Sequence, residues 1–117
     1  MNRHRELDVW QLAGELIDAV YVIANKLPPS ERYVAVSQLR RAAWSVQNNI
    51  AEGNAKLGRG ELRRSLDVSL GSLGEIDSMI AKLSAMYQLD VQAVQRIESL
   101  RRRITAGIFH LLRRSRG

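Results

Sequence analysis

Residues 38–53 read QLRRAAWSVQNNIAEG, and this stretch decides the fold. Its apolar side chains recur at steps of four, three and four residues, which places them on one face of an α-helix. They are Leu39, Ala43, Val46 and Ile50. A polar stripe runs beside this face and consists of Arg41, Ser45, Asn49 and Glu52. The stretch therefore predicts a long amphipathic helix that buries one face.

The same apolar spacing occurs in the segments before and after this one. It predicts helices at about residues 7–27, 31–52, 61–87 and 91–113. Pro28 and Pro29 end the first helix, because the residue before a proline is pushed out of the α region. Ser30 and Asp90 are suited to cap the second and fourth helices, and Gly53 to end the second in a left-handed turn. The sequence therefore predicts one all-α domain over residues 1–117, an antiparallel up-down-up-down four-helix bundle with left-handed packing.

The composition excludes several classes of protein. The chain has 117 residues, of which 45% are hydrophobic, and it contains no cysteine. A disulfide framework and thiolate chemistry are therefore excluded. No run of 18 apolar residues occurs, and the first ten residues are too polar for a signal peptide. We expect a cytoplasmic protein with no membrane partner.

Candidate catalytic and metal-binding residues are few. His4 and His110 lie at opposite ends of the chain, whereas zinc needs three or four clustered ligands. Glu52 and Glu75 belong to different helices, and paired acid chemistry also needs a pocket. We therefore expect no enzymatic activity, no metal and no cofactor.

Positive charge is concentrated at the end of the chain. The net charge is +6, and residues 91–117 hold seven arginines and one glutamate, which equals the whole excess. Such asymmetry is typical of proteins that bind a polyanion. The alternative is a solvated helix face. The candidate RNA- or DNA-binding residues are Arg96, Arg101, Arg102, Arg103, Arg113 and Arg114. Because Phe109 is the one aromatic residue nearby, such binding is expected to be largely independent of sequence.

A second surface lies opposite the apolar face of the second helix. A tryptophan on that side is typical of an interface anchor, since a lone bundle would expose it to solvent. The residues predicted for this surface are Tyr33, Arg40, Trp44 and Ala51. The predicted receptor on a neighbouring chain is an outer stripe of the third helix, Gly71, Gly74 and Ser78. The alternative is that these are scattered surface side chains.

The polar stripe of the second helix has two interpretations. Arg41, Ser45, Asn49 and Glu52 either satisfy one another and neighbouring helices, or line a groove for a ligand. Partly buried polar networks usually specify packing and register. We favour the structural interpretation.

Several segments resemble a known family. They are DVWQLA at 8–13, VY at 20–21, LP at 27–28, QLRRAAWSVQNNIAEGNA at 38–55 and GSLGEI at 71–76. In this order and spacing they resemble the four-helix-bundle proteins encoded in intervening sequences of bacterial 23S ribosomal RNA genes. The family is related to the accessory protein of diversity-generating retroelements, which binds nucleic acid. The resemblance implies a ring-like homopentamer without enzymatic activity.

Two functions follow as hypotheses. The first is a non-enzymatic oligomeric scaffold that binds RNA or DNA through its basic surface. The second is a module that docks a partner protein through exposed helical faces, with the charge serving solubility. Nucleic-acid binding should weaken with salt, whereas docking through apolar positions should tolerate it.

Overall fold

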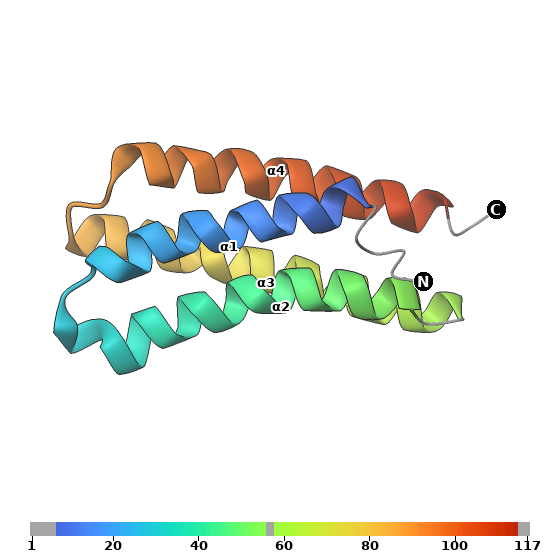
Figure 1. Ribbon diagram of the computed structural model, residues 1–117, viewed down its shortest axis with the longest axis horizontal. Helices are drawn as coiled ribbons and strands as arrows, with labels where there is room; N and C mark the ends of the chain where they lie inside the picture. Colours follow the sequence, from blue (N-terminus) through green and yellow to red (C-terminus); the bar gives the residue numbers. More distant parts are fainter. Residues whose placement is uncertain (1–6, 56–57, 115–117) are drawn as a thin grey trace.

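The computed structural model describes residues 7–55 and 58–114, which form four long α-helices lying side by side (Figure 1). The helices are α1 (Asp8–Lys26), α2 (Ser37–Ala55), α3 (Arg59–Met86) and α4 (Val91–Arg114). None of the described residues lies in a strand. Figure 1 shows consecutive helices running in opposite directions. The predicted all-α four-helix fold is confirmed, while its handedness and a ring assembly stay predictions.

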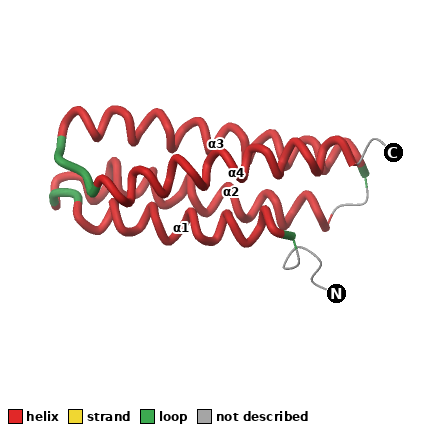
Figure 2. The backbone as a smooth tube through the Cα atoms, turned by 90° about the horizontal axis from the view of Figure 1, so that it is seen from above, coloured by secondary structure: helices red, strands yellow, loops and turns green. Residues whose placement is uncertain are grey.

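Figure 2 shows the four helices from above, lying along one another. Their inward faces form one apolar core. Each predicted apolar position of the opening stretch is fully buried, because its helix turns that face towards the other three. The largest fully buried side chains of the other three helices include Leu16, Leu66, Ile76 and Ile104. α2 packs most closely on α3 and α1 on α4, whereas α3 and α4 pack loosely against each other. The outer surface between α1 and α2 therefore lies across the bundle from the surface between α3 and α4.

The entry into α2 differs from the prediction. A 3-10 turn at Pro29–Glu31 and a π-helical turn at Arg32–Val36 come before the α-helix. No side-chain cap forms here, so the predicted capping role of Ser30 is wrong. Pro28 begins the turn instead, and its carbonyl accepts the N–H of Glu31 at 2.9 Å. The Glu31 carboxylate accepts a hydrogen bond of 2.6 Å from the Tyr87 hydroxyl, which ties the entry of α2 to the end of α3.

Gly53 does not end α2. It is helical and buried, and none of the described residues has a positive φ angle, so the predicted left-handed stop is wrong. A Cβ atom at Gly53 would lie 3.0 Å from the Cβ of Ser65 and 3.3 Å from Cδ1 of Leu62. Glycine is therefore needed here because α2 and α3 approach closely. The helix continues to Ala55, and α3 begins at Arg59.

The start of α4 agrees with the prediction. The Asp90 carboxylate accepts the backbone N–H of Ala93 at 2.9 Å, which is the hydrogen bond of an N-cap. Its second oxygen lies 3.2 Å from the Lys26 ammonium group. The hydrogen bond from Ala93, helped by the one from Lys26, lowers the pKa of Asp90 below its ordinary value. The charged carboxylate therefore stabilises both the helix start and its contact with α1.

This lowered pKa predicts how the Asp90 cap depends on pH. Because the folded state favours the ionised form, its stabilisation is complete above the unfolded pKa and is lost as pH falls through the folded one. We expect wild type to be more stable than Asp90→Ala by a constant margin above about pH 5, and by a shrinking margin below about pH 4. Urea unfolding between pH 7 and pH 2 measures the margin. A margin that stays constant down to pH 2 would contradict the capping role.

Candidate nucleic-acid interface

Three of the six predicted α4 arginines are bound to carboxylates of the same chain. Nη2 of Arg96 donates to Oε1 of Glu15 on α1 at 2.7 Å. Arg101 donates to Glu98 at 3.1 Å, and its Nε lies 3.6 Å from the carboxylate of Asp77 on α3. Arg102 lies 3.7 Å from the same Glu98 carboxylate. Arg96 therefore joins α4 to α1, and Arg101 joins it to α3. Arg101 and Arg102 also contact the preceding turn of α4.

Arg101 is the most firmly held of the three. Its side chain is 26% exposed, and its hydrogen bond to Glu98 raises the pKa of the guanidinium group. The same hydrogen bond is the main cause that lowers the pKa of Glu98. The pair therefore stays ionised at neutral pH. The ion pair with Asp77 links α4 to α3, but the Nε of Arg101 does not form a hydrogen bond with any described residue.

The other three predicted arginines remain available. Arg103, Arg113 and Arg114 are exposed, and none forms an ion pair with another residue in 7–55 or 58–114. Figure 1 shows that the end of α4 and the start of α3 lie at the same end of the bundle. The start of α3 adds two more exposed arginines, Arg59 and Arg63, which have no ion pair within the described segments either. Arg103 lies about three turns before Arg114, near the middle of α4, and the other four arginines lie at this end. We call these five arginines the basic end.

Sequence reasoning missed Arg59 and Arg63. They lie outside the arginine-rich residues 91–117, whose net charge equals the whole positive excess of the chain, so a count along the sequence directs attention away from them. The signal that could have found them is local. Residues 58–64 read GRGELRR, with arginines on both sides of a predicted helix start.

Trp44 has a partner inside the chain, contrary to expectation. Its indole N–H donates to the Tyr21 hydroxyl of α1 at 3.0 Å. Arg40 lies 4.8 Å above the centre of the Tyr21 ring and donates to Oδ1 of Asn25 at 2.7 Å. Trp44 therefore makes a hydrogen bond within the single chain, which its position on the second helix did not predict. Trp44 nevertheless remains 46% exposed, while Tyr33 is 84% exposed and Ala51 is half-buried.

The outer stripe of α3 is open. Gly71, Gly74 and Ser78 are exposed, and a Cβ atom at either glycine would meet nothing within 4 Å. No helix of this chain approaches them among the described residues, so the chain itself gives no packing reason for these two glycines. Whether Trp44 and this stripe belong to an interface between chains stays a prediction.

The polar stripe of α2 divides in two. Ser45 and Asn49 face α3, where Ser45 and Ser72 are joined by a hydrogen bond of 2.9 Å between their hydroxyl oxygens. The Asn49 amide donates to the carbonyl and hydroxyl oxygens of Ser45. These contacts support the structural interpretation for Ser45 and Asn49. Arg41 and Glu52 are exposed and lie outside this network.

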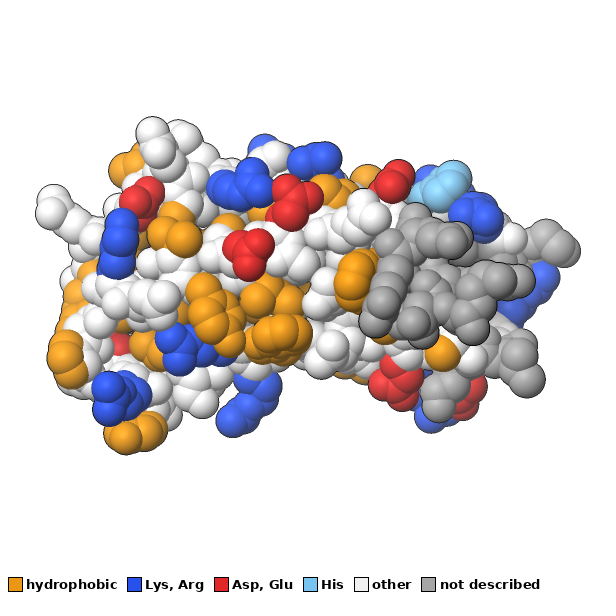
Figure 3. Space-filling model, in the orientation of Figure 1, with side chains coloured by type: hydrophobic (Ala, Val, Ile, Leu, Met, Phe, Trp, Pro, Cys, Tyr) orange, Lys and Arg blue, Asp and Glu red, His pale blue; other side chains and the backbone are white. Residues whose placement is uncertain are grey.

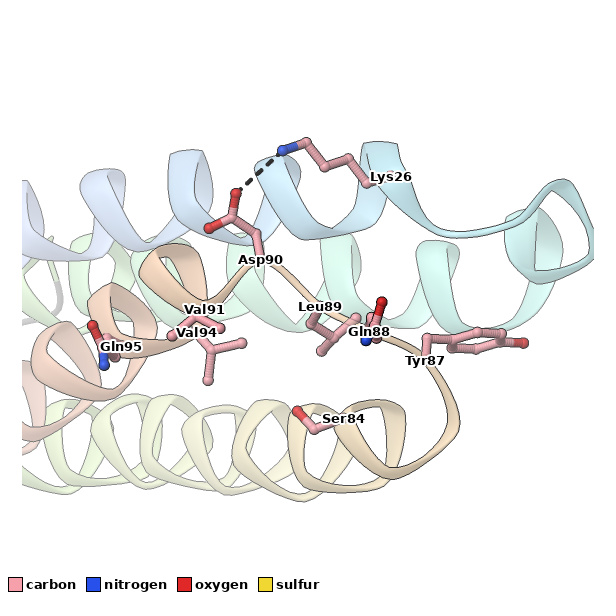
Figure 4. A pocket seen from close by; sticks show the side chains of 9 residues that line it. All are labelled: Lys26, Ser84, Tyr87, Gln88, Leu89, Asp90, Val91, Val94 and Gln95. Atoms are coloured by element: carbon pink, nitrogen blue, oxygen red, sulfur yellow. Dashed lines mark hydrogen bonds and ion pairs between the residues drawn. The ribbon is translucent and has the colours of Figure 1, made fainter.

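A hollow lies between the end of α3 and the start of α4 (Figure 4). It has a volume of about 680 Å³. Leu89, Val91 and Val94 point into it towards α3, with Ser84 opposite. Residues 7–55 and 58–114 contain no group of three or more His, Asp or Glu side chains arranged to hold a metal ion. Over the same segments, no helix is long and apolar enough to cross a membrane.

Comparison with known proteins agrees with the resemblance seen in the sequence. No curated protein matches the chain. The family model described as 23S rRNA-intervening sequence protein matches residues 5–110, which covers the four helices almost to the end of α4. This chain therefore belongs to the family of 23S rRNA-intervening sequence proteins.

Proposed function

We propose that this chain is a non-enzymatic, homo-oligomeric cytoplasmic scaffold that binds RNA or DNA through a basic surface, largely without sequence specificity. The observation that carries the proposal is the basic end, where Arg59, Arg63, Arg103, Arg113 and Arg114 are exposed and not ion-paired with other described residues. Arginines in this state can replace phosphate counterions without first breaking a contact of the fold. The family name itself supports only an origin in ribosomal RNA genes.

The scaffold part of the proposal requires self-assembly, which two features support. The family resemblance suggests five copies in a ring. The open stripe Gly71, Gly74 and Ser78 offers a surface on which a helix of another copy can approach closely. Several copies of a weak basic surface would then act together by avidity.

Two triple variants of α4 test the nucleic-acid proposal. Arg103→Gln/Arg113→Gln/Arg114→Gln removes three unpaired arginines, and Arg96→Gln/Arg101→Gln/Arg102→Gln removes three that are ion-paired. Both lower the net charge equally, so the second is a matched control. We expect the first variant to weaken binding about tenfold or more at 50 mM salt, and to reduce the slope of log K against log salt by about 2 for a single strand.

Fluorescence anisotropy measures the affinity and its salt dependence. The probes are labelled RNA and DNA oligonucleotides of two unrelated sequences, and the salt concentration is varied between 50 and 200 mM. Similar affinities for both sequences are expected. An equal loss of affinity in the two triple variants would contradict the role of the basic end. Absence of binding by wild type at 50 mM salt would reject the proposal as a whole.

A second candidate function is docking of a partner protein. It is favoured by the hollow between α3 and α4, whose rim exposes 67% of Val91, and by Phe109 at 47% exposure further along α4. Exposed apolar side chains beside a hollow are typical of docking surfaces. Such binding should persist in 200 mM salt, which distinguishes it from binding by the basic end.

A further inference from the structure

Two neighbouring hollows lie on the outside of the bundle between α1 and α2, with volumes of about 480 Å³ and about 320 Å³. Both are lined by Asn25, and the Arg40–Asn25 hydrogen bond lies between them. Figure 3 shows hydrophobic side chains gathered over α1 and α2 at mid-length, with basic side chains beside them. We call the two hollows together the α1–α2 groove.

The first hollow presents an aromatic surface held in a fixed orientation. Trp44 and Tyr21 line it, and their hydrogen bond of 3.0 Å restrains the indole ring while leaving Trp44 46% exposed. The rest of the lining is mixed: Gly14, Ile17 and Val22 are apolar, whereas Asp18, Asn25 and Gln47 are polar. Asn25 already accepts a hydrogen bond from Arg40, and Gln47 donates one to the Trp10 carbonyl. Asp18 is therefore the polar group with no such bond to another described residue. An aromatic ring beside amide and carboxylate groups suits a planar ligand with polar edges, which a nucleobase has.

The second hollow is basic. Arg32 and Arg40 line it, and the described lining contains no carboxylate. A strand that places a base against Trp44 would therefore run its backbone past two guanidinium groups. Aromatic platforms joined to a basic groove are the usual design of single-strand binding surfaces.

We propose that the α1–α2 groove binds single-stranded nucleic acid, with a base stacked on Trp44 and the neighbouring phosphates paired with Arg32 and Arg40. This inference rests on the proposed function and adds a second contact site to the basic end. It also names the ligand class, because a base within a duplex is already stacked and cannot reach the ring. The carboxylate of Asp18 is placed to accept hydrogen bonds from an exocyclic amino group.

A second copy of the chain fits the groove less well. The central part of a protein–protein interface is usually depleted of aspartate, whereas arginine and aromatic residues are enriched there. Asp18 therefore counts against a second copy, because its carboxylate would be buried in the contact. The outer stripe of α3, on the opposite side of the bundle, remains for self-assembly.

Tryptophan fluorescence tests the proposal. A single-stranded oligonucleotide of about 15 nucleotides, within the site sizes of single-strand binding surfaces, is titrated into the full chain at 50 mM salt, with a duplex of the same length for comparison. We expect the single strand to quench the fluorescence of wild type, and Trp44→Leu to bind it 5- to 100-fold more weakly by anisotropy. Trp44→Phe keeps an aromatic face and should retain most of the affinity. Trp10→Phe should retain the quenching, because Trp10 lies outside both hollows.

The outcomes separate this inference from the proposed function. Trp44→Leu could bind the single strand as tightly as wild type, while the Arg103→Gln/Arg113→Gln/Arg114→Gln variant binds it more weakly. In that case the groove is not a binding site, and the role of the basic end is retained. Equal quenching by single strand and duplex would also overturn stacking. Light scattering then measures whether Trp44→Leu assembles like wild type. A lower assembly mass for that variant would mean that a second copy occupies the groove, and would overturn the proposal.

Discussion

Gly53→Val is expected to lower the free energy of unfolding by about 3 kcal/mol, the upper part of the range for overpacked sites. A single Cβ at this position already comes within 3.0 Å of the Ser65 Cβ and 3.5 Å of the backbone oxygen of Leu62. Valine adds two further methyl groups and a fixed rotamer. To accept them, α2 and α3 must move apart. That movement disturbs the hydrogen bond of 2.9 Å from Ser69 on α3 to the carbonyl of Val46.

Gly60→Val is the control for this variant. Gly60 also lies in a helix, but it is exposed and a Cβ there meets nothing within 4 Å. Its stability should stay within about 0.5 kcal/mol of wild type. Urea unfolding followed by circular dichroism measures both variants. A similar loss of stability at the two positions would show that the backbone preference of valine causes the destabilisation, and not the close approach of α2 and α3.

Gly71→Glu/Gly74→Glu is expected to convert the assembled protein into monomers. Light scattering should give wild type a mass that is a multiple of 13.2 kDa, which is about 66 kDa for five copies, and the variant 13.2 kDa. Two new carboxylates at a close contact between helices would be buried without a partner. They would also lie beside Asp67 and Glu75, which already make this face of α3 acidic. The fold itself should be unaffected, because both positions are open in the single chain.

Ala106→Glu supplies a control for added negative charge. Ala106 is exposed on α4, so this variant adds one carboxylate, against two in the double glycine variant, to a different surface and should leave the mass unchanged. Circular dichroism confirms that the variants keep their helices. A double glycine variant that assembles like wild type would remove the outer stripe of α3 from the interface. A wild-type mass of 13.2 kDa would overturn self-assembly altogether.

The helices could be predicted from the sequence because the spacing of apolar residues determines which side chains are buried. Leu39, Ala43, Val46 and Ile50 are all fully buried, since a helix of this pattern has one apolar face and must turn it away from water. Asp90 could be predicted as a cap for a similar reason, because its hydrogen bond reaches only three residues along the chain. Gly53 could not be interpreted correctly. A glycine near a helix end suits both a left-handed stop and a close approach, and only the position of Ser65 on α3 distinguishes them.

The candidate site was less predictable, because it depends on which charges meet. Arg96 and Arg103 look alike in the sequence, yet Arg96 is bound to Glu15, 81 residues earlier, while Arg103 is exposed. Trp44 looked unpartnered because its partner Tyr21 belongs to another helix. No pattern within one helix contains this information.

The amino-acid sequence by itself therefore determined the four helices, their buried faces, the basic charge and the family. These properties depend on residues within a few turns of one another, where helix geometry fixes the spacing. Only the tertiary structure decided which arginines are free, why Gly53 is a glycine, and that an aromatic and basic groove lies between α1 and α2. Each of these depends on how two helices are placed beside each other, and that placement is set by packing of the whole core.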